Sequence, residues 1–491
     1  MRSTAFAPVR IIYVGVSPLK VIVAVSLAIA ALLLLALGPR ADEDLPKDRV
    51  VIDYWEKWTG NEELGIRDAV DDFNRTVGAE KHIYVRYVST STINLKTLMA
   101  TAAGVPPDVA GLWDNNLVQF ASLDALEPLD DLATQHGIDE STYMPVYWKG
   151  CHWNGHLYSL ISTPATIAMF YNTKIFHENA DRLRAVGLDP DRAPRSIDEL
   201  DAYAKVLDDI GPDGHISRAG YLPLEPGWYI TDTFMWFGGS IWDQKTEKFT
   251  LTDPKVVNAF KWVQSYSRRL GKDAMNEFRG GVSGGATNWA SPQNPFLTSS
   301  VVMIQQGPWM ANHILNYNPA MDGLKSANEE NLQEPLEQRR KRIQWAAAPF
   351  PSAVPGVNDA CYAPFDTLVI PKGCKHIKEA FEFIAFINRQ DVMEKLCNAH
   401  SKNSPLRKVS ADFLEHHKNP YIDVFEKLAA SPNAQSVPQI PIMPEVGDEL
   451  NNAAQSIALL QAQPEDALRE AQVRLQAKYD DFMQKRRARN Q

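Results

Sequence analysis

Short apolar runs alternate with segments of helical periodicity in the region after residue 48. Residues 50–55 form an apolar run, and Ile66, Val70 and Phe73 then repeat at the spacing of one helix face. The alternating segment HIYVRYV follows, then a second helical segment, and VPPDVAGLWD begins the next apolar run. These periods predict the order strand, helix, strand, helix, strand. Such an order is typical of a mostly parallel sheet with helices on both faces and with binding loops at the carboxyl ends of its strands.

The predicted secondary structure changes twice within residues 160–178. Pro164 interrupts one apolar run, and the run at residues 167–171 is too short for a helix and rich in strand-forming side chains. Asn172 then opens a predicted helix. A strand that ends in an aromatic residue and Asn directly before a helix lies where open α/β sheets bind ligands, although an ordinary strand-to-helix turn fits the same spacing.

Helix starts are marked further along the chain. Ser196 and Glu199 form a capping box, and Asp253 precedes a proline at the first position of another predicted helix. A predicted strand at residues 301–304 leads into Gly-Pro-Trp at 307–309. The charged residues 325–342 have little apolar periodicity, which favours a surface insertion or a short solvated helix.

The N-terminus carries three basic residues before residues 21–37, in which Ser26 is the only polar side chain, and acidic residues follow at 42–44. This pattern predicts an export signal or a membrane anchor. We expect an uncleaved anchor with its N-terminus inside, so that residues from about 41 onwards work outside the cytoplasmic membrane.

Composition narrows the class of partner. The chain has 491 residues, 45% of them apolar, which allows a large core and two or three domains. Its formal net charge is −10, which argues against a nucleic-acid surface, because such a surface needs a basic stripe. A neutral or polar small ligand fits better.

Four cysteines permit two disulfides in an exported chain, and buried free thiols fit equally well; they are Cys151, Cys361, Cys374 and Cys397. Cys151, His152 and His156 lie in a predicted hairpin around Asn154 and Gly155. A zinc site needs a third and fourth partner that the spacing does not supply. We therefore expect neither a metal nor a cofactor.

Several segments resemble the extracellular solute-binding proteins of carbohydrate ABC importers. In AMFYNTKIFHE the pattern is matched by Ala168, Met169, Phe170, Tyr171, Asn172, Phe176 and Glu178, while Ile161 and Ser162 depart from it. AAGVPPDVAGL, LEPLDDL, the Gly-Pro-Trp segment, IQWAAAPFP, FDTLVIPKG and SKNSPLRKVS resemble later family segments in order, although Ser299 stands where Gly is usual. The resemblance covers roughly residues 48 to 485.

This resemblance implies an α/β fold of two lobes, the type II periplasmic-binding-protein-like fold, preceded by an N-terminal transmembrane or signal segment. The implied parts are a signal or anchor and linker at 1–47, a first lobe at 48–161 plus 366–402, a second lobe at 165–362 plus 404–485, and a tail at 486–491. Three chain crossings near residues 162–165, 362–366 and 403–405 would join the lobes.

Sugar binding requires apolar faces for ring C–H groups and a rim of donors and acceptors for hydroxyls. The residues that we expect to contact the ligand are Trp58, Asp114, Tyr171, Trp236, Trp309 and Arg407. Large aromatic side chains are mostly core residues, so about half of the tryptophans near the expected cleft should be buried. Asp114 also fits a helix N-cap.

The function implied is extracytoplasmic binding of a mono- or oligosaccharide and its delivery to ABC permease subunits, without enzymatic activity. Two alternatives stay open: a ligand sensor of the same fold that feeds a signalling protein, and an extracellular glycan hydrolase. Residues 281–285 satisfy the G-x-S-x-G pattern of hydrolases, but neither the strand nor the helix that this motif needs flanks them. We interpret them as a flexible loop.

Overall fold

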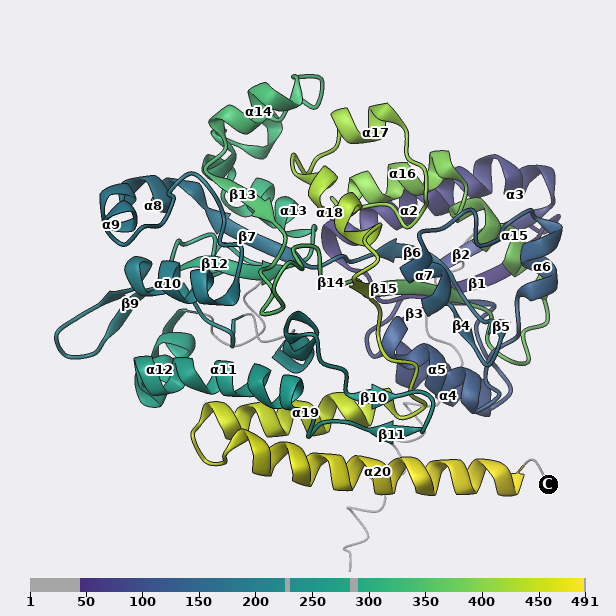
Figure 1. Cartoon of the computed structure of the whole chain (residues 1–491). Helices are drawn as coiled ribbons and strands as arrows, with labels where there is room; N and C mark the ends of the chain where they lie inside the picture. Colours follow the sequence, from purple (N-terminus) through teal and green to yellow (C-terminus); the bar gives the residue numbers. More distant parts are fainter. Residues whose placement is uncertain (1–44, 226–229, 283–289, 490–491) are drawn as a thin grey trace, which may run out of the picture. The chain divides into compact units, whose positions relative to one another are not determined.

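The structure is a computed structural model, and it describes residues 45–225, 230–282 and 290–489. Residues 49–491 form one compact unit, in which two five-stranded sheets organise the helices (Figure 1). Within the described ranges, no helix is both long and apolar enough to cross a membrane. The expected anchor at residues 21–37 and Ser283 of the G-x-S-x-G sequence lie outside the described residues.

The first sheet has the strand order β2-β1-β3-β15-β6. Its strands are β1 (Val50–Glu56), β2 (Ile83–Ser89), β3 (Val109–Trp113), β6 (Leu160–Pro164) and β15 (Phe365–Val369). β1 pairs in parallel with β2 and β3, whereas β15 is antiparallel to both of its neighbours, β3 and β6. The predicted strand–helix alternation is thus confirmed, and a strand from much later in the chain completes the sheet.

The helices and the small hairpin of this half come from two parts of the chain. They are α2 (Gly60–Arg75), α3 (Val77–Glu80), α4 (Ile93–Ala102), α5 (Asp114–Ser122), α6 (Asp130–Gln135), α7 (Pro145–Gly150), β4 (His152–Trp153), β5 (His156–Leu157), α15 (Ile377–Ile387) and α16 (Gln390–Ala399). Helices α2 and α15 meet in a cluster in which the rings of Phe73 and Phe383 lie 5.3 Å apart, beside Tyr54 of β1. This apolar contact packs α2 and α15 against β1 of the first sheet.

The second sheet has the order β13-β7-β12-β9-β8. Its strands are β7 (Ala168–Asn172), β8 (Asp209–Ile210), β9 (Ile216–Tyr221), β12 (Val301–Gln306) and β13 (Trp345–Ala348). The other elements here are α8 (Thr173–Glu178), α9 (Ala180–Ala185), α10 (Ile197–Leu207), η1 (Ile230–Phe237), β10 (Trp242–Asp243), β11 (Lys248–Phe249), α11 (Pro254–Leu270), α12 (Lys272–Val282), α13 (Met310–Tyr317), η3 (Pro319–Asp322), η4 (Ala327–Glu329), α14 (Leu336–Arg342) and β14 (Cys361–Tyr362). β7 is antiparallel to both of its neighbours, β12 and β13.

Three helix starts follow the predicted caps. The Asn172 side chain accepts a hydrogen bond from the backbone N–H of Ile175 at 3.0 Å, which fixes the turn from β7 into α8. Ser196 caps α10 and Asp253 caps α11 in the same way. Each cap satisfies a backbone donor that the first helical turn leaves without a partner.

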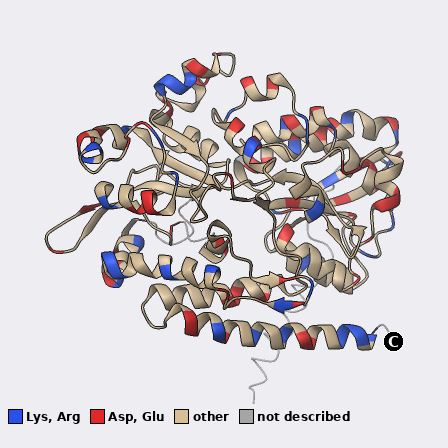
Figure 2. Ribbon diagram, viewed as in Figure 1, with Lys and Arg blue, Asp and Glu red and all other residues tan. Residues whose placement is uncertain are grey.

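The C-terminal part adds α17 (Ala411–Glu415), α18 (Ile422–Ala429), β16 (Ala434–Gln435), α19 (Met443–Ala458) and α20 (Pro464–Arg489). Helices α19 and α20 pack on each other and on α11, and α19 also contacts α5. The long α20 runs along the lower edge in Figure 1, and its acidic and basic residues alternate before a basic end (Figure 2). That end is not free, because the Arg486 guanidinium lies 4.6 Å from the Trp153 ring centre.

All four cysteines are buried free thiols, so the structure contains none of the disulfides that the sequence allowed. The hairpin around Asn154 and Gly155 is confirmed, and both turn residues have positive φ angles, 50° and 83°. In the described part of the chain, no group of His, Cys, Asp or Glu is arranged to hold a metal ion.

Candidate functional site

Three tryptophans converge where the two sheets meet. Trp58 follows β1, Trp113 ends β3 and Trp309 follows β12. The rings of Trp58 and Trp113 lie 5.6 Å apart, edge to face. The Lys402 ammonium lies 4.5 Å from the Trp58 ring centre and 5.6 Å from that of Trp309, so one cation contacts a ring of each lobe. Cations over aromatic faces in this way attract the ring electrostatically.

Strand register brings these side chains to one edge of the first sheet. β1 and β3 are parallel, so their carboxyl ends, and with them Trp58 and Trp113, lie at the same edge. β15 runs the other way and pairs its second residue, Asp366, with Trp113. A charged residue from a distant part of the chain thereby reaches the end of β3.

A buried network of charges holds this edge together. Asp366 contacts two ammonium groups, that of Lys57 at 3.1 Å and that of Lys402 at 3.2 Å. Thr163 donates to Asp366 at 2.9 Å and accepts from Lys402 at 3.0 Å, and Lys57 also pairs with Glu56 at 3.1 Å. Burial opposes ionisation of Asp366, but the two lysines outweigh it and hold its pKa below the ordinary value. Both basic groups at this edge therefore have carboxylate partners.

Two glycines make the close packing possible. A Cβ atom at Gly111 of β3 would lie 1.9 Å from the Glu56 carboxylate, and one at Gly307 would lie 1.9 Å from the Trp309 ring. Any larger residue would therefore displace the network or the ring. The glycine of the Gly-Pro-Trp segment is thus explained by the way in which Trp309 folds over its own backbone.

Residues of the second lobe, the half of the molecule built on the second sheet, line the other side of the junction. Asn312 of α13 donates to the Ala399 carbonyl at 3.1 Å and accepts from the Ser401 hydroxyl at 2.7 Å. A cavity of about 190 Å³ lies between the lobes here, lined by Thr59, Gly60, Glu62, Ala290, Trp309, Asn312, His313, Asn316 and Tyr317. The residues of both lobes therefore enclose one cleft.

Polar groups face this junction from both lobes. The Asp114 carboxyl accepts the Phe365 backbone N–H at 3.1 Å, and burial, with smaller effects from Asp366 and Asp232, raises its pKa to about 8. Asp232 of η1 comes from the second lobe, and burial raises its pKa to about 7. Carboxyl groups that titrate near neutrality can donate or accept a hydrogen bond. The buried indole N–H of Trp58 donates to none of the described residues.

The six predicted ligand contacts divide into two groups. Trp309 lines the cavity between the lobes, whereas Trp58 and Asp114 lie at the adjacent edge of the first sheet and do not line it. Asp114 is the first residue of α5 and not its N-cap, a position that Trp113 takes. The hydrogen bonds of the exposed Arg407 go to Glu140 and Thr142, beside α7, and not to the cleft tryptophans.

Trp236 and Tyr171 differ from the expectation. Trp236 is fully buried, its indole N–H donates to the Ala360 carbonyl at 3.1 Å, and its ring packs 5.2 Å from Phe350. Trp236 is therefore a core residue of the second lobe and has no free face for a sugar. The prediction that it contacts the ligand is wrong. Tyr171 lines a different cavity, beside Phe350 and Arg192.

The sequence reasoning missed four residues of this cluster. Trp113 stands directly before Asp114 at a predicted strand end, so its position could have identified it, and its side chain is 43% exposed at the junction. Lys57, Asp366 and Lys402 meet only through strand pairing and chain crossings far apart in the sequence. Local patterns carry no signal for such a contact.

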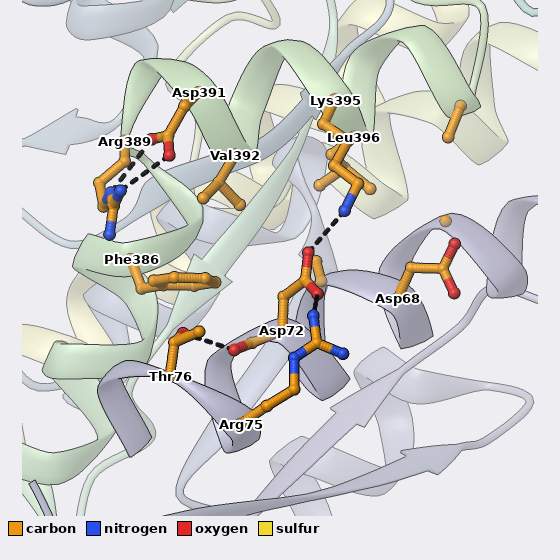
Figure 3. Close-up of a pocket in the computed structure, with 13 residues that line it drawn as sticks. Asp68, Asp72, Arg75, Thr76, Phe386, Arg389, Asp391, Val392, Lys395 and Leu396 are labelled. Atoms are coloured by element: carbon orange, nitrogen blue, oxygen red, sulfur yellow. Dashed lines mark hydrogen bonds and ion pairs between the residues drawn. The ribbon is translucent and has the colours of Figure 1, made fainter. Parts of the chain in front are cut away.

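A larger groove of about 340 Å³ lies between α2 and α16 on the first lobe (Figure 3). Its charged groups already bind each other: Asp72 pairs with Arg75 and with Lys395, and Arg389 pairs with Asp391 at 2.7 Å. Among the described residues that line the groove, the Asp68 carboxylate is the one charged group without an ion-pair partner, so most of the charge here is already neutralised and the cleft is the better candidate.

Comparisons with known proteins agree with this geometry. The sequence profile of the family "Bacterial extracellular solute-binding protein" matches residues 59–394. A maltotriose-binding protein from Pyrococcus abyssi is 27% identical over 165 residues, 33% of this chain and 32% of that protein. The Escherichia coli K12 sn-glycerol-3-phosphate-binding periplasmic protein UgpB is 26% identical over 211 residues, 41% of this chain and 44% of that protein. The chain thus matches less than half of the length of either relative.

A solved structure matches over a longer span. CpMnBP1 with mannotriose bound superposes with a TM-score of 0.70 at 26% sequence identity, covering 87% of this chain and 99% of that chain. The same protein with mannobiose bound gives a TM-score of 0.71. The two-lobed α/β fold is therefore shared over nearly the whole neighbour.

Proposed function

Because this chain belongs to the bacterial extracellular solute-binding protein family, we propose that its inter-lobe cleft binds an uncharged mono- or oligosaccharide and delivers it to ABC permease subunits. The observation that carries this proposal is the meeting of Trp58, Trp113 and Trp309, from both lobes, where Trp113 is 43% exposed and Trp309 is half-buried. Sugar rings present C–H groups to such faces, and the Asp114 and Asp232 carboxyls and the Trp58 N–H suit their hydroxyls.

The charge balance of the cleft favours a neutral ligand over a phosphorylated one. A phosphate group is held by free Arg or Lys groups that donate charge-assisted hydrogen bonds. Lys57 and Lys402 are instead committed to Glu56 and Asp366. Asp114 and Asp232 add acidic groups from both lobes, which would repel a phosphate once ionised.

Ligand capture would work by closure of two rigid bodies. In our assignment the lobes comprise residues 48–161 plus 366–402 and residues 165–362 plus 404–485, joined by three crossings. A ligand that touches both lobes stabilises the closed arrangement only through interactions that the open arrangement lacks. We also propose that residues 21–37 anchor the exported protein to the cytoplasmic membrane.

Paired tryptophan variants test the site. With mannotriose as the probe, Trp309→Ala should weaken binding by about 1 to 3 kcal/mol, or five- to 150-fold, and should lower the melting temperature less than Trp236→Ala, because the Trp309 ring is only half-buried. Trp236→Ala is the matched control from the same lobe. It should cost about 3 to 5 kcal/mol of stability, while the folded fraction binds normally. If Trp309→Ala instead lowers stability by this amount and the folded fraction still binds mannotriose normally, Trp309 does not belong to the site.

The ligand class is tested on the unaltered protein. A thermal-shift panel should include mannotriose, maltotriose, sn-glycerol 3-phosphate and amino acids. A saturating sugar at 100 times its dissociation constant should add about 2.7 kcal/mol to the free energy of unfolding. If only the phosphate ester or an amino acid raises the melting temperature, the carbohydrate proposal fails.

A glycan hydrolase is the second candidate, and one observation favours it. Asp114 and Asp232 are two carboxyl groups from opposite lobes with pKa values raised to about 8 and about 7. Glycosidases use one protonated and one ionised carboxyl on the two sides of the scissile bond. Incubation with mannotriose or maltotriose, followed by product analysis, separates the two functions, since a binding protein returns the sugar intact.

A further inference from the structure

The second lobe contains a cavity of about 460 Å³ that is separate from the cleft residues. It lies between the segment that leads into α10 and the segment that follows β13, which are joined by a parallel bridge between Ser196 and Ser352. Tyr171 of β7 also lines it. Its volume is in the range of small-molecule sites.

Tyr171 carries an unused hydrogen-bonding group into this cavity. The side chain is only 9% exposed, and its ring packs 5.2 Å from Phe176, but its hydroxyl bonds to none of the described residues. The neighbouring Tyr203 hydroxyl, by contrast, donates to the Asp189 carbonyl at 2.6 Å. Solvent reaches this hydroxyl, so a ligand that takes the place of water in the cavity can donate to it or accept from it.

The rim combines donors and acceptors. Arg192 is committed to Glu199 through two contacts, at 2.7 and 2.9 Å. The guanidinium of the exposed Arg195 forms no ion pair or hydrogen bond within the described residues. Asp191, whose carboxylate also contacts the His177 ring at 3.1 Å, and the Asn358 amide line the same cavity.

The lining between these polar groups is apolar and consists of Ala193, Pro194, Ala348, Pro349, Phe350 and Pro351. An apolar lining with a few directed polar groups is typical of small-ligand sites. Hydroxyl groups both donate and accept, so a polyhydroxylated ring can use the arginine, the carboxylate and the tyrosine together. An anion would gain from Arg195 but would lie near the Asp191 carboxylate.

We propose that this cavity is a second ligand site, which holds one neutral polyhydroxylated ring, such as a hexose, against the Tyr171 hydroxyl. The site lies within the second lobe, so its occupancy does not require closure of the cleft. It is also independent of which ligand the cleft takes.

D-Mannose is the probe, and saturation-transfer NMR on the full chain measures its binding. Tyr171→Phe removes only the hydroxyl and should weaken the Tyr171-dependent binding about 2- to 12-fold, the effect of one lost hydrogen bond. Tyr171→Trp, which fills the cavity, should abolish it. Tyr203→Phe is the matched control: it removes a satisfied hydroxyl nearby and should leave D-mannose binding unchanged.

Trp309→Ala separates this site from the cleft, because it should leave the Tyr171-dependent signal intact. Equal D-mannose binding by wild type, Tyr171→Phe and Tyr171→Trp would overturn the proposal and leave the cavity to water. Inorganic phosphate is the competing probe. If phosphate binds in a manner that depends on Tyr171 and Arg195 and D-mannose does not, the assignment to a neutral ring is wrong.

Discussion

Two aromatic clusters of this protein contain similar rings in different surroundings. In the second lobe, Phe170 stacks on Trp345 at 5.3 Å and lies 5.7 Å from Phe425, with all three rings buried. At the cleft, Trp58 and Trp113 are equally close to each other, but ammonium groups lie over their faces and Trp113 stays 43% exposed. Aromatic residues therefore do not by themselves indicate a sugar site. The cleft cluster differs from the core cluster in the exposure of Trp113 and in the charged groups beside its rings.

The largest expected effect concerns the charges under the cleft cluster. Asp366→Asn leaves Lys57 and Lys402 buried with one carboxylate fewer, and breaking a buried pair in this way costs about 3 to 5 kcal/mol. Urea unfolding measures the loss. Asp391→Asn, which breaks the exposed pair with Arg389, is the control and should change stability little. Equal stability of the two variants would show that the network does not hold the cleft cluster together.

A smaller effect is expected from the tight contact behind the network. Gly111→Ala places a Cβ atom 1.9 Å from the Glu56 carboxylate, and such overpacking costs about 1 to 3 kcal/mol. Gly447→Ala in α19 is the control, because its Cβ would meet no atom within 4 Å and alanine favours a helix. Thermal melting compares them. A Gly111→Ala protein that melts with the wild type would mean that the edge of the first sheet adapts easily.

The acidic groups of the cleft predict a pH dependence. The pKa of Asp114 is about 8 in the folded protein and about 3.9 in an unfolded chain. Between these values the folded state binds more protons, so stability falls as pH rises, by at most about 1.4 kcal/mol per pH unit. Asp232 likewise makes stability fall as pH rises, up to about pH 7, because its pKa is also raised.

The window from pH 7 to 8 separates this effect from that of the histidines, and comparison with Asp114→Asn separates it from Glu426, whose pKa burial also raises to about 8. The buried His400 and His417 have pKa values lowered to about 3 and act oppositely, but mainly below about pH 6.5. Melting curves of Asp114→Asn should therefore fall less steeply with pH than those of the wild type. Asp139→Asn, at a surface loop where hydrogen bonds lower the carboxyl pKa, should keep the wild-type slope. Identical slopes for Asp114→Asn and wild type would contradict the raised pKa.

Local signals in the sequence predicted the elements well because their causes are local. The Asn172 and Ser196 caps act within three residues, and the Gly-Pro-Trp segment follows the strand that leads to it. The charged residues 325–342 do include a short helix, α14, but its Arg339 is buried against the carbonyls of His417 and Lys418, which no charge pattern predicts.

The side-chain environments of the site depend on contacts between distant residues. Trp236 is buried because its N–H reaches Ala360 and its ring reaches Phe350, so its position in an aromatic-rich helix could not reveal which way it faces. Arg407 binds the Glu140 carbonyl for a similar reason. Strand order and chain crossings decide these contacts, and neither can be calculated from local periodicity.

The position of β15 in the first sheet has a consequence for biosynthesis. β15 lies between β3 and β6, yet it is encoded about 200 residues after β6. While the chain emerges from the ribosome N-terminal end first, β3 and β6 lack the strand that joins them until residue 369 has been made. Pairing across such a sequence distance is intrinsically slow. The nascent first sheet thus stays incomplete until about three quarters of the chain has been made.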